Sequence, residues 1–197
     1  LGIKPAQLVT IYNPFDISEI VQHANKDNPF AGEDYILHVG RFHQVKRHDR
    51  LLEAFAIAKL PCKLVLVGQG EEEIKMAIQQ KITTLNLQDK VILAGFYQNP
   101  LPIIKEARIV ALSSDSEGLP TVLIEALICH TPIVSTRCPG GVAEIMTGEL
   151  AAYMAEMNPD SLAEKLRLAW NKPPIITAET YRKFDRDNIL DKYISLI

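Results

Sequence analysis

The sequence predicts a single α/β domain in which a parallel sheet of about six strands is covered by helices on both faces, a doubly wound Rossmann-like fold. Short apolar runs alternate with longer amphipathic segments along the chain. The apolar runs are nearly continuous, which is typical of strands buried on both faces of a parallel sheet. With 197 residues, 47% hydrophobic and 23% charged, the chain is long enough for one domain with a sizeable core.

The first half of the chain contains three of the predicted strands. Residues 8–12 are a short strand-like run that ends at Asn13-Pro14, and residues 23–34, rich in Asn, Asp, Pro and Gly, are expected to form a loop. Strands are expected at 35–39, 63–67 and 91–93, where aliphatic residues follow one another. Helices are expected at 50–59, where Leu51, Leu52 and Phe55 share one face, and at 71–84.

The second half continues the alternation and ends in an amphipathic helix. We expect a short helix at 101–106, a strand at 109–112, a helix at 120–128 and a strand at 133–135. Residues 150–154 are the candidate sixth strand, and a helix is expected at 161–170. A last helix, 187–197, places Ile189, Leu190, Tyr193, Ile194 and Ile197 on one face. We expect this helix to dock outside the domain, so that its apolar face is partly exposed, mobile or used in a crystal or dimer contact here.

Composition narrows the class of protein. A net charge of −3 gives no indication of nucleic-acid binding, and no apolar run approaches the roughly 20 residues that span a bilayer. The three cysteines, Cys62, Cys129 and Cys138, are far apart and odd in number, which favours a reducing cytoplasm over a disulfide framework or a zinc site. The chain begins Leu1-Gly-Ile-Lys, so we expect it to be the middle of a longer protein.

Residues 113–125, which read SSDSEGLPTVLIE, predict a phosphate site. An apolar strand ends just before them, and Pro120 stands at the predicted first helical position, where its missing N–H removes no hydrogen bond. A helix N-terminus leaves N–H groups free and attracts anions. Those groups belong here to Gly118, Leu119 and Thr121. Glu117 and Glu125 flank the site with carboxylates that suit hydroxyl groups, a combination that fits a nucleotide-sugar.

The segment EGLPTVLIEAL, with two glutamates eight residues apart, resembles the Glu-x7-Glu motif of retaining glycosyltransferases of family 4. The segment TPIVSTRCPGGVAEI, which begins at Thr131, fits the same family. The resemblance covers nearly the whole chain and implies the C-terminal half of the two-domain GT-B fold. It implies one donor-binding domain over 1–197, in which 1–34 crosses over from the N-terminal domain and 185–197 docks back on it.

The segment from Gly40 to Lys46, GRFHQVK, resembles the Gly-Arg…Lys segment of that family. The resemblance implies that Gly40 lies at the donor and that Arg41 and Lys46 bind its diphosphate. Fixed cations at that place would stabilise the charge that the diphosphate gains as the sugar bond breaks. The plainer alternative is a solvated basic loop, because Arg47 and Arg50 are nearby.

Two further turns follow predicted strands. Gly68-Gln-Gly70 lacks the third glycine of a dinucleotide fingerprint, since Glu73 stands in its place. We expect a tight turn lining the donor cleft, although a plain turn explains it equally well. The resemblance places Phe96 and Tyr97 beside the nucleotide base, where their backbone groups would contact a base edge. A simple strand-end turn with a core Phe is the alternative.

The resemblance gives the two glutamates different roles, Glu117 contacting the donor sugar and Glu125 the ribose hydroxyls. An ordinary helix acid favoured by the dipole is the alternative for Glu125. His130 stands where the family usually has Gly, so we expect it to adopt the left-handed conformation of a helix cap. No metal and no cofactor is expected, because protein cations and a helix dipole would hold the diphosphate of a UDP- or GDP-sugar.

The function implied is the donor-binding half of a retaining glycosyltransferase of hexosyltransferase type, with Arg41, Lys46 and Glu117 as catalytic residues. Bacterial lipopolysaccharide, capsule or other envelope glycans are the implied products. A GT-B-fold sugar epimerase and a non-catalytic nucleotide-binding module are the alternatives. The acceptor, a glycan or lipid, would bind the missing N-terminal domain, so this chain alone is expected to be inactive. We expect a cytoplasmic protein, with peripheral association of the full-length enzyme at the inner face of the membrane.

Overall fold

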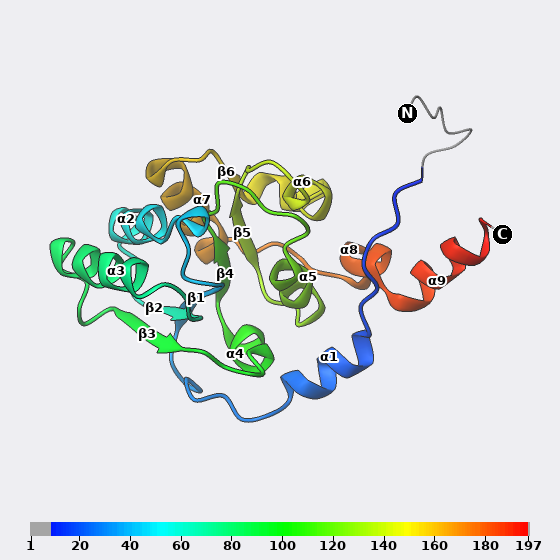
Figure 1. Cartoon of the computed structure of the whole chain (residues 1–197), viewed down its shortest axis with the longest axis horizontal. Coiled ribbons are helices and arrows are strands. Elements are labelled where there is room, and N and C mark those ends of the chain that lie inside the picture. The colour runs from blue at the N-terminus through cyan, green and yellow to red at the C-terminus, as the bar shows by residue number, and fades with distance from the viewer. Residues whose placement is uncertain (1–8, 197) are drawn as a thin grey trace.

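The centre of the domain is a six-stranded parallel sheet, seen in a computed structural model that describes residues 9–196 (Figure 1). The strand order is β3-β2-β1-β4-β5-β6, the order of a doubly wound fold built outward from its middle in two halves. The strands are β1 (Tyr35–Val39), β2 (Lys63–Val67), β3 (Val91–Gly95), β4 (Ile109–Leu112), β5 (Ile133–Thr136) and β6 (Met154–Ala155). The predicted fold class is therefore confirmed.

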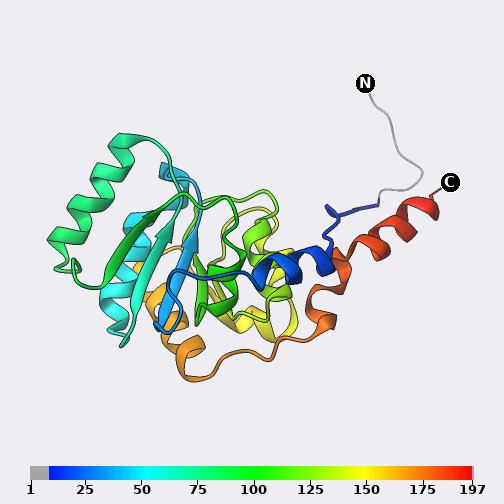
Figure 2. The same cartoon turned by 90° about the horizontal axis from the view of Figure 1, so that it is seen from below.

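Helices cover both faces of the sheet (Figures 1 and 2). One face carries α2 (His48–Ala58), α3 (Glu72–Thr84) and α7 (Pro159–Asn171), and the other carries α4 (Leu101–Glu106) and α5 (Thr121–Ile128), with α1 (Ile17–Ala24) packed against both of the latter. The central strands β1 and β4 are buried between these layers, with Ile36, Leu37, Ile109 and Val110 fully buried, whereas most of the edge strand β3 is only partly buried. Each such side chain contributes about 1.5–3 kcal/mol relative to an exposed one. Burial on both faces explains the continuous apolar runs.

Three sequence expectations are wrong in detail. Residues 9–12 form no strand among the described residues, and the segment after them contains a helix, α1, that was not expected; Asp16 caps it by accepting a hydrogen bond from the Glu19 N–H at 3.0 Å. The predicted strand at 150–154 is mostly a 3-10 turn, η2 (Gly148–Tyr153), because only Met154 and Ala155 reach the edge of β5. Pro120 is the N-cap of α5 and not its first helical residue.

The C-terminal helix α9 (Arg186–Ile194) follows the short α8 (Ala178–Tyr181) and η3 (Arg182–Phe184) and projects from the domain beside the N-terminal segment (Figures 1 and 2). Of the predicted apolar face, Ile189 is fully buried, whereas Leu190, Tyr193 and Ile194 are 48%, 53% and 68% exposed. Ile197 lies outside the described residues. The face is thus partly exposed, as predicted. No helix in the described part of the chain is long and apolar enough to cross a membrane.

Candidate functional site

The carboxyl ends of β1, β2 and β3 open into a cleft of about 810 Å³. The cleft is lined by Val39, Gly40, Arg41, Val67, Gly68, Gln69, Gly70, Glu71, Phe96, Tyr97, Gln98 and Pro100. Five of the predicted donor-binding residues are among them: Gly40, Arg41, Gly68, Phe96 and Tyr97. The cleft therefore lies where doubly wound folds bind their ligands, next to the β1–β4 switch point.

Backbone packing forms one wall of this cleft. The N–H of Gly40 donates to the Val67 carbonyl at 3.0 Å, and the loops after β1 and β2 continue side by side. Gly68 has φ of 153°, and a Cβ added there would lie 1.9 Å from the Gly40 carbonyl oxygen. Only glycine fits at such a separation, because real Cβ atoms do not approach oxygen below 3.0 Å. The Gly68-Gln-Gly70 turn thus lines the cleft and also holds two loops together.

The aromatic pair after β3 lies at the mouth of the cleft. Phe96 is 64% exposed, so it is not the core residue that the simpler alternative required. Tyr97 is half-buried and packs its ring against Phe30, with centroids 6.4 Å apart. An exposed ring beside a packed one offers an apolar surface of the kind on which planar groups stack.

Lys46 and Glu117 meet at the switch between β1 and β4. Lys46 ends the short helix η1 (Gln44–Lys46), and its Nζ lies 2.6 and 2.9 Å from the two carboxylate oxygens of Glu117. The Ser114 hydroxyl donates to the same carboxylate at 2.5 Å. A Cβ added to Gly40 would lie 3.8 Å from Lys46 Cδ, so this pair borders the cleft. The structure therefore brings together two residues that are 71 positions apart.

The loop of Glu117 is held by the loop that follows β5. The N–H of Glu117 donates to the Pro139 carbonyl at 3.1 Å, and the N–H of Gly141 donates to the Gly118 carbonyl at 2.6 Å. Gly140 has φ of 107°, and a Cβ there would lie 1.6 Å from the Glu117 carbonyl oxygen. The position of Glu117 therefore depends on a glycine that no other residue can replace without moving the loop.

The N-terminus of α5 presents free donors beside this loop. Within residues 9–196, no acceptor takes the N–H groups of Gly118 and Leu119, and Thr121 begins the helix with an exposed side chain. Glu125 lies one turn further along and is half-buried, and this burial raises its pKa. Neither Glu125 nor Thr121 lines the cleft described above. The predicted site thus falls into a cleft group and an α5 group, with Lys46 and Glu117 between them.

His130 caps the C-terminal end of α5 and does not line the cleft. Its φ is 59°, its N–H donates to the Leu127 carbonyl at 3.0 Å, and the N–H of Thr131 donates to the Ala126 carbonyl at 2.8 Å. These are the two bonds of a Schellman cap. The His130 ring rests near Ile176, with Nδ1 3.2 Å from its carbonyl oxygen. The predicted left-handed helix cap is confirmed.

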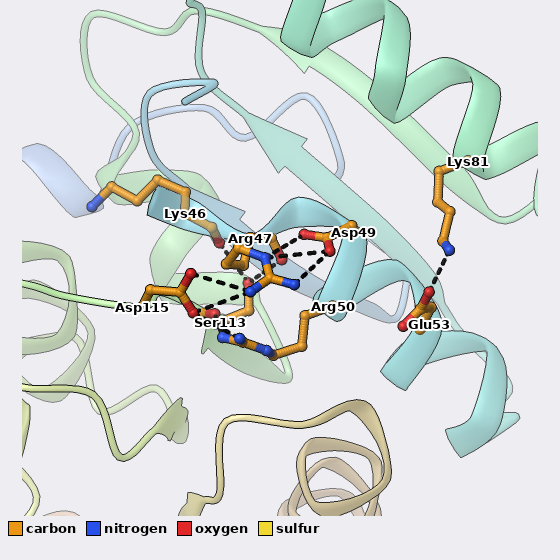
Figure 3. Close-up of polar contacts among 8 residues, drawn as sticks. All are labelled: Lys46, Arg47, Asp49, Arg50, Glu53, Lys81, Ser113 and Asp115. Carbon is orange, nitrogen blue, oxygen red and sulfur yellow. Dashed lines mark hydrogen bonds and ion pairs between the residues drawn. The ribbon is translucent and has the colours of Figure 1, made fainter. Parts of the chain in front are cut away.

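Sequence reasoning missed a cluster of ion pairs behind the site, in which Arg47 and Arg50 both contact Asp115 (Figure 3). Burial opposes ionisation of Asp115, but the hydrogen bonds from Arg50 and Arg47 outweigh it and lower its pKa. The two arginines had favoured a solvated basic loop, but Arg50 is buried. Among the described residues no cluster of His, Cys, Asp and Glu is suited to hold a metal ion.

The strand order and the cleft at the carboxyl ends of the strands are those of a Rossmann-like α/β domain that binds a ligand at its switch point. The family model described as Glycosyl transferases group 1 matches residues 20–188, and the chain belongs to this family.

Relatives with known names resemble most of the chain. The N-acetylgalactosamine-N,N'-diacetylbacillosaminyl-diphospho-undecaprenol 4-alpha-N-acetylgalactosaminyltransferase of Campylobacter jejuni is 33% identical over 167 residues, covering 84% of this chain and 45% of that protein. The lipopolysaccharide 1,6-galactosyltransferase of Escherichia coli is 26% identical over 212 residues, covering 100% of this chain and 57% of that protein. The chain thus spans about half the length of these relatives, 45% and 57%.

Two solved structures share the fold. HepE of Anabaena, in complex with UDP and glucose, superposes with a TM-score of 0.81 at 22% identity, covering 95% of this chain and 56% of that one. TarM of Staphylococcus aureus, in a complex that includes UDP, gives a TM-score of 0.80 at 23% identity and covers 100% of this chain and 40% of that one. Both likenesses support the GT-B type of Rossmann-like domain described above.

Proposed function

We propose that this chain is the nucleotide-sugar-binding, C-terminal half of a retaining glycosyltransferase of the GT-B fold. The observation that carries the proposal is the contact of the Lys46 ammonium with the Glu117 carboxylate, at 2.6 and 2.9 Å, beside the cleft at the switch point. A fixed cation next to a fixed hydroxyl-binding acid suits the junction between a diphosphate and a sugar. Family membership supports the reaction class, sugar transfer.

The donor would lie across the carboxyl ends of the strands. Arg41 is exposed at the cleft and would bind diphosphate oxygens in bidentate fashion. Lys46 borders the cleft and, while paired with Glu117, would add a point charge beside the diphosphate. The free N–H groups of Gly118 and Leu119 add partial positive charge. The attraction between these cations and the diphosphate grows as the bond to the sugar breaks. It therefore lowers the barrier to transfer more than it strengthens binding of the donor.

The two glutamates and the aromatic turn would hold the rest of the donor. Glu117 would accept hydrogen bonds from hydroxyls of the transferred sugar, and Glu125, without a side-chain partner in the described part of the chain, from the ribose hydroxyls. Phe96 and Tyr97 at the cleft mouth would take the base. A carboxylate beside the sugar also stabilises positive charge that develops on the ring as the bond to the diphosphate breaks.

The acceptor and the product are inferred from the GT-B arrangement and from two relatives of the chain. In the GT-B arrangement a preceding domain would bind the acceptor, with residues 1–34 leading from it and the exposed face of α9 returning to it. Two named relatives act on diphospho-undecaprenol-linked and lipopolysaccharide glycans, which supports an envelope glycan acceptor and a cytoplasmic enzyme at the inner membrane face. On this proposal the 197-residue chain alone transfers no sugar.

The experiment is a thermal-shift screen of the purified chain with UDP, GDP and their common sugar derivatives. A ligand that binds only the folded state at a hundred times its Kd raises the free energy of unfolding by about 2.7 kcal/mol. We expect one base to be preferred, and the matching sugar donor to stabilise the chain at least as well as the plain diphosphate. No stabilisation by any of these compounds at millimolar concentration would contradict the proposal. Donor turnover by the full-length protein then separates a transferase from a non-catalytic module.

A further inference from the structure

A buried guanidinium ties the loop of Lys46 to the loop of Glu117. Arg50, in the first turn of α2, is only 5% exposed. Its Nη1 donates to the Ser113 carbonyl at 2.6 Å, and its Nη2 donates to the Asp115 carboxylate at 2.7 Å (Figure 3). Both acceptors belong to the loop that follows β4. A side chain anchored on α2 therefore holds the backbone and a carboxylate of the loop that carries Glu117.

Further hydrogen bonds join the same two loops. The Ser113 hydroxyl lies 2.8 Å from the Lys46 carbonyl and 3.0 Å from the Arg47 carbonyl. The N–H of Asp115 donates to the Val45 carbonyl at 2.8 Å, and Arg47 Nη1 donates to Asp115 Oδ2 at 3.1 Å. The Arg47 that makes this contact has a left-handed backbone conformation, with φ of 49°. Asp115 is thus held by both arginines and by its own backbone.

The sheet itself does not align these loops. Pairing between β1 and β4 covers only Ile36 with Ile109 and Leu37 with Val110, well before Lys46 and Glu117. Beyond the strand ends, the side chains of Arg50, Ser113 and Asp115 connect the loop after β1 to the loop after β4. Asp115 lies two positions before Glu117, so a shift of Asp115 moves the carboxylate that meets Lys46. A buried arginine is strongly disfavoured without its partner, which makes this connection stiff.

We propose that Arg50 and Asp115 are positioning residues that set the Glu117 carboxylate against the Lys46 ammonium. The proposal rests on the proposed function, in which Glu117 contacts the sugar and Lys46 the diphosphate. Lys46 belongs to the β1 side of the connection, so it keeps its place in the cleft when the connection is cut. Glu117 belongs to the β4 side, where its hydrogen bonds to the loop after β5 remain, but its carboxylate shifts relative to Lys46. Cutting the connection should therefore weaken recognition of the sugar and spare the nucleoside diphosphate.

The chain offers a matched control on the same helix. Glu53, three positions after Arg50, pairs with Lys81 and joins α2 to α3 away from both loops (Figure 3). The Glu53 side chain is 35% exposed, against 43% for that of Asp115, so the two acids are similarly accessible. Glu53→Gln removes an ion pair of α2 without touching the site. It reports what general loosening of α2 does to binding.

The first test is titration calorimetry of the chain with UDP and with UDP-N-acetylglucosamine. Asp115→Ala should weaken the sugar donor by about tenfold, because a hydroxyl loses its carboxylate, and should change UDP binding by less than about twofold. Asp115→Asn should be intermediate, since its amide oxygen still accepts from Arg50 while its NH2 group faces Arg47. Glu53→Gln should change neither affinity. Equal weakening of both ligands by Asp115→Ala, or no weakening of either, would overturn the positioning role.

Hydrogen–deuterium exchange supplies a readout that does not depend on nucleotide binding. Asp115→Ala should speed exchange in peptides covering 113–118 and leave peptides covering 43–47 unchanged, and Glu53→Gln should speed it only in α2 and α3. Unchanged exchange at 113–118 in Asp115→Ala would overturn the inference whatever the ligands do. If the unsubstituted chain binds neither these compounds nor GDP or its sugar derivatives, the proposed function fails, and the exchange result alone decides whether Arg50 and Asp115 hold the loop.

Discussion

Two buried histidines should make the stability of the domain depend on pH well above the range of its carboxylates. His38 and His48 are 0% and 3% exposed, and their ring centroids are 4.8 Å apart. His38 Nδ1 lies 2.9 Å from the Ala111 carbonyl, while the Nε2 atoms of both rings find no partner within the described residues. Burial lowers the pKa of His38 to about 4 and that of His48 to about 3, from an ordinary value of 6.5. Both rings are therefore neutral in the folded protein near neutrality.

The sign and size follow from proton linkage. Between pH 6.5 and about 4 the unfolded chain takes up protons on these histidines and the folded chain does not, so the free energy of unfolding falls as pH falls. The slope is about 1.4 kcal/mol per pH unit for each histidine. Lowering the pH from 7.5 to 5 should thus remove about 2 kcal/mol per histidine, or about 4 kcal/mol for the pair. The stabilisation is fully present above pH 6.5.

The assay is urea unfolding of the purified chain at a series of pH values from 7.5 to 4.5. His48→Phe, which keeps an aromatic ring against Phe42, should reduce the slope below pH 6.5 by about one proton, or about 1.4 kcal/mol per pH unit. The control is His43→Gln, because the His43 side chain is 46% exposed and does not belong to the buried pair. Equal slopes in the unsubstituted chain and in His48→Phe would refute the reasoning.

Three further predictions concern the loops and the C-terminal helix. Gly140→Ala should move Glu117 and lower the free energy of unfolding by more than about 2 kcal/mol, whereas Gly148→Ala, at φ 58° with nothing within 4 Å of the new Cβ, should lower it by about 1 kcal/mol in urea titrations. Leu190→Ser with Ile194→Ser should change stability by less than about 0.5 kcal/mol and raise solubility, which sedimentation of concentrated samples checks. The 197-residue chain should release free sugar or product from no UDP-sugar at a rate above buffer, measured by UDP release.

Strands β1, β2, β4 and β5 were predictable because they are buried on both faces, a condition that leaves a continuous apolar run in the sequence. The cap at His130 was predictable because the family has glycine at that position, and the structure gives His130 the left-handed φ of 59°. Both cases depend on local pattern. The helix α1 was not predicted because it is a short element next to a segment rich in turn residues, and a capping residue such as Asp16 also suits a turn.

The ion-pair cluster around Arg50 could not be predicted from the sequence, for a different reason. Arg50 and Asp115 are 65 positions apart, and they meet only because β1 and β4 are neighbours in the sheet. Nothing in the local sequence distinguishes a buried arginine from a solvated one at the start of a helix. The pairing of Lys46 with Glu117 has the same origin. The sequence motifs identify the two residues but give no distance between their side chains in the fold. Long-range polar contacts therefore required the topology.

The most direct test of the central claim is calorimetric titration of the chain with UDP and with its preferred UDP-sugar, comparing Lys46→Ala and Glu117→Gln. Lys46→Ala should weaken both ligands by about 1.5–3 kcal/mol, because both lose a charge-assisted hydrogen bond to the diphosphate. Glu117→Gln should weaken only the UDP-sugar and leave UDP unchanged or tighter, since the carboxylate no longer competes for Lys46 at 2.6 Å. Equal weakening of UDP and the UDP-sugar by Glu117→Gln would contradict a donor site divided between diphosphate and sugar.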